Sequence, residues 1–285
     1  MDIDIERMDS ASFLPKQDLK YVDVLDLHSL YDGLAFRGAC VMVGPKGIGK
    51  TLSVQAWASK NDCPIITFDC SEDVRRAHLL GMQVLRGDQS PFILGPLTTA
   101  FEVANEVGQC IVALEEVNAL TPQMQKALNA VTDWRAEIVV PECRRVFKLQ
   151  SGAKLWVVGT MNTAVYGGVY ELNEDLKSRM RIIKLDYPMP KAEKEILKTQ
   201  LNGNIDNKIL DSVILLAHET RQKTLEYALS TRDVVQILED VQHLDLQRAL
   251  RVALGKFDGN DAATVQTRMV SIFGKNAPAA PGKTP

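Results

Sequence analysis

A glycine-rich stretch between two expected regular elements carries the clearest chemistry in the sequence. Residues 44–51 read Gly-Pro-Lys-Gly-Ile-Gly-Lys-Thr and match the pattern GxxxxGK(S/T) at every fixed position. The apolar run 39–43 before it predicts a buried strand, and residues 52–60 after it predict a helix. Glycines let the backbone fold round a phosphate chain, whose charge then faces loop N–H groups and the positive end of the helix. The pattern predicts that Lys50 reaches the β- and γ-phosphates of a nucleotide and that the Thr51 hydroxyl binds Mg²⁺.

Carboxylate and amide side chains follow two further expected strands. Glu115 and Glu116 end the apolar run 110–114, which is typical of a central parallel strand, and Asn162 follows the strand expected over 154–159. The carboxyl ends of parallel strands line the ligand crevice of an open sheet, so we expect these side chains beside the glycine-rich loop. We predict that Glu115 holds the water shell of Mg²⁺, that Glu116 polarises the attacking water, and that Asn162 orients it.

Two arginines are candidates for contacts with the phosphates. Arg179 comes just before the strand expected over 181–185, where an arginine can stabilise charge on the γ-phosphate, often of a neighbouring subunit. Arg181 is the reserve candidate, and a surface arginine at a helix C-terminus is the alternative interpretation. Arg232 lies in a Ser-Thr-Arg-Asp sequence that opens a helix, from which it could reach across a domain cleft. A capped surface helix is the alternative there.

The predicted site therefore has three groups of residues. The predicted catalytic residues are Lys50, Glu116, Asn162 and Arg179, and the predicted metal ligands are Thr51 and Glu115. The residues predicted to bind the nucleotide are Gly44, Pro45, Lys46, Gly47, Ile48, Gly49, Lys50, Thr51, Leu52 and Arg232.

The order of expected elements predicts the domain organisation. Strands alternate with helices through residues 1–187, which is typical of an α/β, doubly wound parallel sheet of the P-loop class, with an N-terminal extension over 1–20. Residues 188–274 show helical periodicity alone and predict a small all-helical lid domain. Residues 275–285 are rich in Pro, Ala and Gly and predict a disordered tail.

Composition narrows the class of protein. The net charge of −3 gives no electrostatic reason to expect tight, sequence-independent binding of nucleic acid. Five scattered cysteines without a CxxC pair indicate a reducing, cytoplasmic compartment, no disulfide framework and no zinc site. The acidic N-terminus does not resemble a signal peptide, and no apolar stretch of about 18 residues predicts a membrane span.

The order of these features resembles that of the AAA+ ATPases: a P-loop, an acidic strand end, an asparagine after the fourth strand, an arginine before the fifth, and a helical lid with an arginine. Within that class the chain is most similar to the MoxR and dynein-related group, which includes MoxR, CbbQ, NorQ and GvpN proteins. The resemblance covers residues 25–255 and depends on Leu-Leu-Gly at 79–81, Phe-Ile-Leu-Gly-Pro-Leu at 92–97, Glu-Glu-Val-Asn-Ala-Leu at 115–120, Gly-Thr-Met-Asn-Thr at 159–163 and Ser-Thr-Arg at 230–232.

This resemblance implies a homo-oligomer, a hexameric ring that binds ATP and Mg²⁺ between subunits. Arg179 would then act in trans and Arg232 on its own subunit's nucleotide. An insertion at 85–95 and a hairpin at 138–149 would face the pore or a partner. Members remodel or activate other proteins, often with a partner that carries a von Willebrand factor A domain. The family usually has Asp in place of Glu115. Glu is one methylene longer but keeps the charge, so we expect hydrolysis to survive at a slowed rate.

Two alternatives remain open on the sequence. One is a nucleic-acid-associated AAA+ NTPase, McrB-like or a phage replication helper. Residues 160–163 also resemble McrB-type domains, which prefer GTP, and Arg144 and Arg145 lie at the expected hairpin. The acidic net charge and the lack of an appended DNA-binding module disfavour this alternative. The other alternative is an ATP-locked scaffold with little turnover, for which Glu115 is the support.

Overall fold

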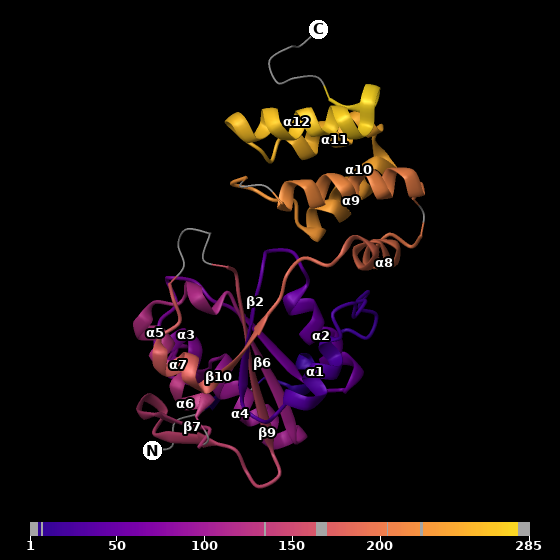
Figure 1. The fold of residues 1–285 in the computed structure, drawn as a ribbon. Helices are drawn as coiled ribbons and strands as arrows, with labels where there is room; N and C mark the ends of the chain where they lie inside the picture. Colours follow the sequence, from indigo (N-terminus) through magenta and orange to yellow (C-terminus); the bar gives the residue numbers. More distant parts are fainter. Residues whose placement is uncertain are drawn as a thin grey trace. The chain divides into compact units, whose positions relative to one another are not determined.

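The computed structural model of the protein contains two compact units (Figure 1). The first unit comprises Met1–Leu19, Asp26–Gly44 and Gly49–Leu185, and the second comprises Lys20–Leu25, Pro45–Ile48 and Asp186–Pro285. The structure describes residues 5–6, 8–133, 135–163, 170–203, 205–222 and 225–278.

The described part of the first unit is built on a five-stranded parallel sheet with the order β10-β2-β9-β6-β3. Its three central strands are mostly apolar and buried, as expected where helices cover both faces. This sheet confirms the predicted α/β fold class. The strands are β2 (Ala39–Val43), β3 (Ile65–Asp69), β6 (Gln109–Glu115), β9 (Lys154–Met161) and β10 (Met180–Lys184).

Helices cover the sheet because alternate strand residues point to opposite faces. Cys40 and Met42 face a core built with α1 (Leu27–Leu34) and α2 (Lys50–Lys60), whereas Val41 faces the core built with α4 (Pro96–Val107). Figure 1 shows α1 and α2 on one side of the sheet and α3, α5 and α7 on the other. The bounds of the remaining helices of this unit are α3 (Arg76–Leu80), α5 (Pro122–Ala127), α6 (Asn129–Thr132) and α7 (Glu174–Arg179), with 3-10 turns at Ser10–Phe13, Val117–Ala119 and Pro141–Cys143.

Two small β elements accompany the main sheet. β7 (Glu137–Val140) and β8 (Arg145–Lys148) form an antiparallel hairpin, as predicted. β1 (Ile5–Glu6), β5 (Phe92–Leu94) and β4 (Gly81–Gln83) form a three-stranded sheet in that order. The sequence analysis did not predict these strands, since two or three residues are too short to show a period of two.

The second unit contains five helices among its described residues, packed round their own apolar core. The predicted helix over 232–247 ends early, at His243, because Asp245 starts a new helix by accepting a hydrogen bond from the Arg248 N–H at 2.9 Å. The helices are α8 (Pro190–Gln200), α9 (Asn207–Arg221), α10 (Thr231–His243), α11 (Leu246–Leu254) and α12 (Gly259–Phe273).

The disordered tail predicted from residue 275 starts too early. Gly274–Asn276 form a 3-10 turn, and Ala277 is buried in the helical core, where its carbonyl oxygen accepts a hydrogen bond from Gln247 Nε2 at 3.2 Å. Burial of Ala277 and this bond order the segment despite its composition. Residues 279–285 of the predicted tail lie outside the described residues. The predicted boundary at 187 stays a prediction, although the contacts group residues 20–25 and 45–48 with the helical unit.

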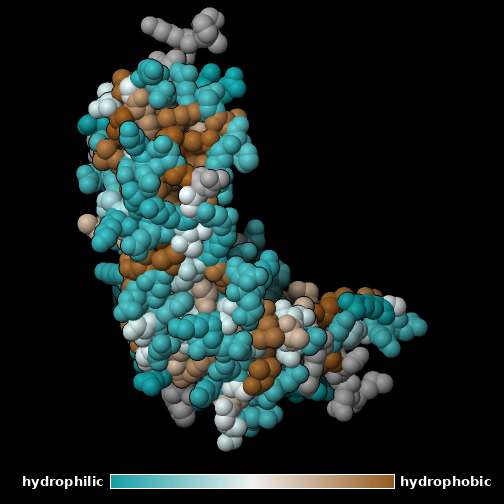
Figure 2. All heavy atoms as spheres, turned by 90° about the vertical axis from the view of Figure 1, so that its right-hand side faces the viewer, coloured by the Kyte–Doolittle hydropathy of each residue, from teal (hydrophilic) through white to brown (hydrophobic). Residues whose placement is uncertain are grey.

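The protein has a largely polar surface on the face drawn in Figure 2, and its cysteines are buried. The face drawn in Figure 2 is largely hydrophilic, with small interspersed hydrophobic patches. All five cysteines are buried free thiols, and burial raises the pKa of Cys40, Cys63 and Cys70 to about 12. Within the ranges that the structure describes, no helix combines the length and the apolar character needed to cross a membrane.

Candidate functional site

The glycine-rich loop joins the carboxyl end of β2 to the first residue of α2. Gly47 and Gly49 have φ angles of +71° and +88°, a region that side chains other than glycine rarely adopt. Gly49 directly precedes α2 and has no side chain with which to cap it. The first N–H groups of this 11-residue helix and the positive end of its dipole therefore suit an anion. Of the other predicted loop residues, Thr51 and Leu52 lie half-buried in the first turn of α2.

Three predicted side chains form one hydrogen-bonded chain. Lys50 Nζ donates to the Gly44 carbonyl oxygen at 2.8 Å and to Asn162 Oδ1 at 3.1 Å. Asn162 Nδ2 in turn donates to Glu116 Oε1 at 3.1 Å. Lys50 and Asn162 are 9% and 4% exposed, while Glu116 is exposed. The chain arises because the three residues follow β2, β9 and β6, which are neighbours in the sheet and run in the same direction.

The backbone at Glu116 is held in an uncommon conformation. Its φ angle is +51°, in the left-handed region, and the 3-10 turn Val117–Ala119 starts directly after it. The Glu116 N–H donates to Thr160 Oγ1 at 3.3 Å. A non-glycine residue in this region costs about 1–3 kcal/mol and is found preferentially at functional sites. No local sequence signal marks Thr160 as a site residue, although it lies in β9 two residues before Asn162.

The residues predicted to hold Mg²⁺ also lie at this edge or at the start of α2. Glu115 ends β6 and is the register neighbour of Asp69, which ends β3. Burial, together with the smaller effect of the negative charges of Asp69, Glu115 and Glu116, raises the pKa of the Cys70 thiol to about 12. All three carboxylates therefore lie close enough to the buried Cys70 thiol to affect its pKa. Such an acidic edge, with the Thr51 hydroxyl in α2, fits the hard oxygen donors that a divalent cation prefers.

Arg179 lies at the amino ends of the strands, the amino edge of the sheet, opposite the carboxyl edge that holds Lys50, Asn162 and Glu116. It ends α7, and the next residue, Met180, begins β10 in register with Ala39, the first residue of β2. The glycine-rich loop follows the far end of β2, four residue steps or about 13 Å along the strand. Arg179 is therefore not part of the Lys50–Asn162–Glu116 chain of its own subunit.

The side chain of Arg179 has partners at that edge. Its Nη1 donates to the Asp175 carbonyl oxygen at 2.9 Å, and its Nη2 lies 3.8 Å from Asp133 Oδ2. Arg181, the reserve candidate, donates from Nη1 to the Arg37 carbonyl oxygen at 2.8 Å. The contact of Asp133 with Arg179 could not be predicted from the sequence, because nothing local links two residues that are 46 positions apart.

Arg232 belongs to the second unit, where it is exposed in the first turn of α10. Ser230 and Asp233 form a reciprocal capping box round it, with the Ser230 N–H donating to Asp233 Oδ2 at 2.8 Å and the Asp233 N–H donating to Ser230 Oγ at 3.2 Å. Gly47 is grouped in the same unit, and a Cβ atom there would lie 2.5 Å from Ser230 Oγ and 3.1 Å from Arg232 Cβ. Only a glycine fits at this position without displacing the start of α10.

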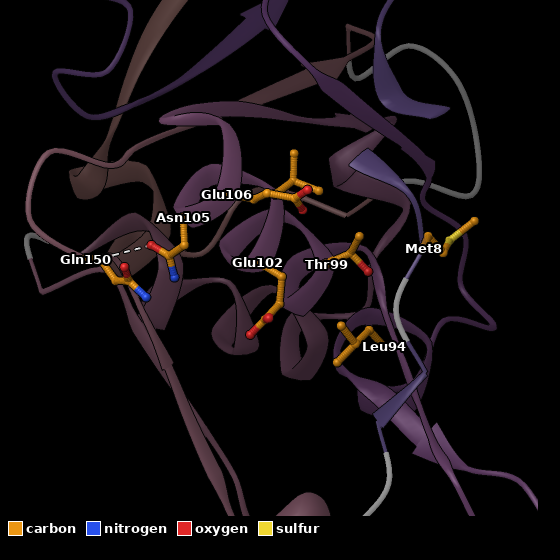
Figure 3. Close-up of a pocket in the computed structure, with 8 residues that line it drawn as sticks. Met8, Leu94, Thr99, Glu102, Asn105, Glu106 and Gln150 are labelled. Carbon is orange, nitrogen blue, oxygen red and sulfur yellow. Dashed lines mark hydrogen bonds between the residues drawn. The ribbon is translucent and has the colours of Figure 1, made fainter. Parts of the chain in front are cut away.

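A separate pocket of about 320 Å³ lies along α4. In Figure 3, Asn105 Oδ1 accepts a hydrogen bond from the Gln150 N–H, at 2.8 Å, on one side of this pocket. None of the predicted site residues lines it, so it is distinct from the candidate site. Its lining residues are Met8, Leu94, Thr99, Glu102, Val103, Asn105, Glu106 and Gln150.

Residues 39–180 match the family model described as AAA domain (dynein-related subfamily). This segment is an AAA domain of that subfamily. The matched AAA domain runs from the first residue of β2 to the first residue of β10 and contains the glycine-rich loop, Glu116, Asn162 and Arg179. The narrower resemblance to MoxR, CbbQ, NorQ and GvpN proteins stays a prediction.

Relatives extend the similarity beyond the AAA domain. Uncharacterized proteins of Staphylococcus haemolyticus and Staphylococcus aureus are 25% and 27% identical to this chain over 221 residues, which cover 74% of this chain and 81% of each relative. A crystal structure of a "putative ATPase" from Cytophaga hutchinsonii is 17% identical, with a TM-score of 0.50 over 95% of this chain and 80% of that one. At that identity the likeness supports the fold, which is the predicted α/β P-loop fold of AAA type.

Proposed function

We propose that this protein hydrolyses ATP in a ring of identical subunits and uses the energy to remodel or activate a partner protein. The observation that carries the proposal is the hydrogen-bonded chain from Lys50 through Asn162 to Glu116 at the ends of three adjacent strands. It joins a cation for phosphate, an amide that can orient water and a carboxylate that can take a proton. These are the parts that hydrolysis of a nucleoside triphosphate requires.

Each residue then has a defined role in the proposed reaction. The loop N–H groups, the start of α2 and the Lys50 ammonium hold the phosphates. Asn162 orients the lytic water, and the Glu116 carboxylate accepts its proton as the water attacks the γ-phosphate. Thr51 and Glu115 would hold Mg²⁺, which neutralises charge on the phosphate oxygens when bound. Glu115 can replace the usual Asp because a carboxylate that acts through water tolerates one extra methylene.

The position of Arg179 supports a shared site. Because it lies at the amino edge of the sheet, it cannot complete the site at the carboxyl edge of its own subunit. On a neighbouring subunit, it could stabilise the charge that develops on the γ-phosphate. A homo-oligomer, a hexamer by the family resemblance, would bring the two edges together. A partner with a von Willebrand factor A domain and a cytoplasmic location are further parts of this proposal.

The test is steady-state ATP turnover by the purified chain over a range of protein concentrations, with Glu116→Gln, Arg179→Ala and their mixture. We expect the specific activity to rise with concentration, both variants to be inactive, and the mixture to recover activity. Recovery follows because a subunit with Arg179→Ala keeps an intact Glu116, and its neighbour supplies the arginine. Failure of the mixture to recover would contradict a shared site.

Two further arms of this test separate the alternatives. Tight ATP binding with turnover no faster than that of Glu116→Gln would indicate an ATP-locked scaffold. Stimulation by DNA, lost in an Arg144→Ala/Arg145→Ala variant, would indicate a nucleic-acid-associated NTPase, since both arginines are exposed on the β7–β8 hairpin. A preference for GTP over ATP would point in the same direction.

A further inference from the structure

A carboxylate is fully buried in the helical unit and is contacted by three other side chains. Glu193 of α8 is 0% exposed, and Arg221 of α9 grips it with two parallel bonds, Nη1 to Oε2 and Nη2 to Oε1, each 2.8 Å long. His218 Nε2 lies 3.0 Å from Oε2, and the Thr231 hydroxyl donates to Oε1 at 2.7 Å. We call Glu193, Arg221, His218 and Thr231 the buried cluster. It ties α8 and α9 to the first residue of α10.

The guanidinium of Arg221 has two further contacts. Its Nε donates to the Leu229 carbonyl oxygen at 2.7 Å, in the loop just before α10. Its Cζ atom stacks 4.1 Å from the centre of the Tyr187 ring, in the segment with which the helical unit resumes after β10. A single planar group thus joins the incoming segment, the Glu193 carboxylate and the approach to α10. The rigid fork of an arginine suits this task, and lysine could not reproduce it.

Packing helices round a buried ion pair has a high desolvation cost. Removing two charges from water costs several kcal/mol per ion, which good geometry only offsets, and apolar side chains of similar size would pack at least as well. The cluster is therefore better explained by what it positions than by the stability it adds.

The buried cluster positions Arg232, the residue that follows Thr231. Arg232 is exposed, but both of its chain neighbours are buried and held by their side chains. Thr231 bonds to Glu193, and Asp233 accepts from Ser230 Oγ at 2.6 Å and from Tyr227 Oη at 2.9 Å, and pairs with Lys256. A side chain meant to meet a ligand is most effective when its backbone is fixed by supporting contacts of this kind.

We infer that Glu193, Arg221 and Thr231 are positioning residues for Arg232, and that they set the direction from which Arg232 meets the phosphates of the nucleotide. This inference rests on the proposed function, because it presumes that Arg232 contacts the nucleotide during turnover. Glu193, Arg221 and Thr231 touch no nucleotide themselves and act through the start of α10.

The central experiment compares Arg221→Lys, which keeps the charge but loses the fork, in the wild-type and Arg232→Ala backgrounds. We expect Arg221→Lys to lower kcat roughly tenfold in the wild-type background, as a small misplacement of a phosphate-binding group does. In the Arg232→Ala background it should lower kcat by less than about twofold, because the group that it positions is already gone. The matched control is Arg268→Lys, which perturbs the more exposed Arg268–Glu219 pair between α12 and α9 of the same unit and should leave kcat unchanged.

A milder pair of variants keeps the test decisive if Arg221→Lys does not fold. Thr231→Val removes the hydroxyl that bonds to Glu193 and keeps the shape, while Thr231→Ser keeps the hydroxyl. We expect the valine variant to lose turnover and the serine variant to keep it, when both are assayed well below their melting temperatures. Losses that are the same in both Arg232 backgrounds, or that follow the melting temperature, would overturn the inference and leave the cluster a stabilising feature alone.

Failure of the inference can be told from failure of the proposed function. If Lys50→Ala turns over ATP like the wild type, the proposed function fails. If Lys50→Ala is inactive but Arg232→Ala turns over normally, the ATPase proposal stands, and the role of the buried cluster in positioning Arg232 is wrong.

Discussion

The two units of this protein use polar side chains in opposite ways. At the carboxyl edge of the sheet, Lys50, Asn162 and Glu116 are joined end to end by single hydrogen bonds of 3.1 Å, and Glu116 remains exposed. In the helical unit, Glu193 is fully buried and has bonds of 2.7–2.8 Å from Arg221 and Thr231. The first set ends in an exposed carboxylate that a ligand can reach, whereas the second surrounds a carboxylate that is fully buried. We therefore expect changes at the sheet edge to affect turnover and changes in the buried cluster to affect stability as well.

The largest effect should come from Glu116→Gln. Loss of the proton acceptor should lower kcat by about 10²–10⁴-fold, the usual contribution of a general base. The melting temperature should stay close to that of the wild type, because Glu116 is exposed and glutamine can still accept the bond from Asn162 Nδ2. The two measurements are phosphate release and thermal unfolding. A large drop in melting temperature would break the contrast between the two units.

Arg221→Ala should instead have its largest effect on the stability of the fold. It leaves the Glu193 charge buried without its main partner and should lower the free energy of unfolding by about 3–5 kcal/mol, measured by urea denaturation. The control Arg268→Ala breaks a pair whose side chains are 45% and 29% exposed and should cost less than about 1 kcal/mol. A double variant, Glu193→Leu with Arg221→Met, should regain most of the stability, since apolar side chains replace buried ion pairs well. If the double variant also regained full turnover, the buried cluster would have no positioning role.

Glu116→Gly should separate stability from chemistry at one residue. The left-handed φ of +51° strains a side chain but not a glycine, and relief of that strain exceeds the flexibility that glycine adds to the unfolded chain. We expect a gain of about 1 kcal/mol in the free energy of unfolding and no turnover. Glu116→Ala is the matched control, because it removes the carboxylate and keeps the strain. Equal stability of the two variants would show that the backbone at 116 stores no strain.

The sequence predicted the sheet edge because its signals are local. The glycine-rich loop, the two glutamates and Asn162 each follow an apolar run, and parallel strand ends converge by geometry. What it could not predict was the detail between strands, such as the Thr160 hydroxyl that holds the Glu116 N–H. That contact depends on the register of β6 against β9, which neither strand specifies alone.

The buried cluster could not be predicted from the sequence. Glu193 and Arg221 are 28 positions apart on helices whose periodicity shows which faces are apolar but not which residues meet. Polar residues at such positions are usually expected at the surface. The ordered segment at 275–278 escaped for a related reason, because its composition predicts disorder and only the contact with the helical core orders it.

The smallest effect should come from Asp133→Asn, which tests whether the amino edge of the sheet also contributes to the site. The Arg135 N–H and the charges of Arg135 and Arg179 hold the pKa of the Asp133 carboxyl below its usual value, so it stays ionised at neutral pH and orients Arg179. Loss of this partly exposed pair should lower turnover only about two- to fivefold. Asp175→Asn is the control, since Asp175 contacts Arg179 through its backbone carbonyl oxygen.

Mixed oligomers can locate the Asp133→Asn defect. A subunit with Asp133→Asn keeps its own Lys50 and Glu116 but presents a poorly oriented Arg179 to its neighbour. Mixing it with Glu116→Gln should therefore restore turnover, because the Glu116→Gln subunit supplies a well-oriented arginine to an intact site. Mixing it with Arg179→Ala should restore nothing, because neither subunit then has a well-oriented arginine. The reverse pattern, recovery with Arg179→Ala but not with Glu116→Gln, would mean that Asp133 acts within its own subunit. The Asp133 side chain would then support its own subunit's site rather than orient Arg179 for the neighbouring one.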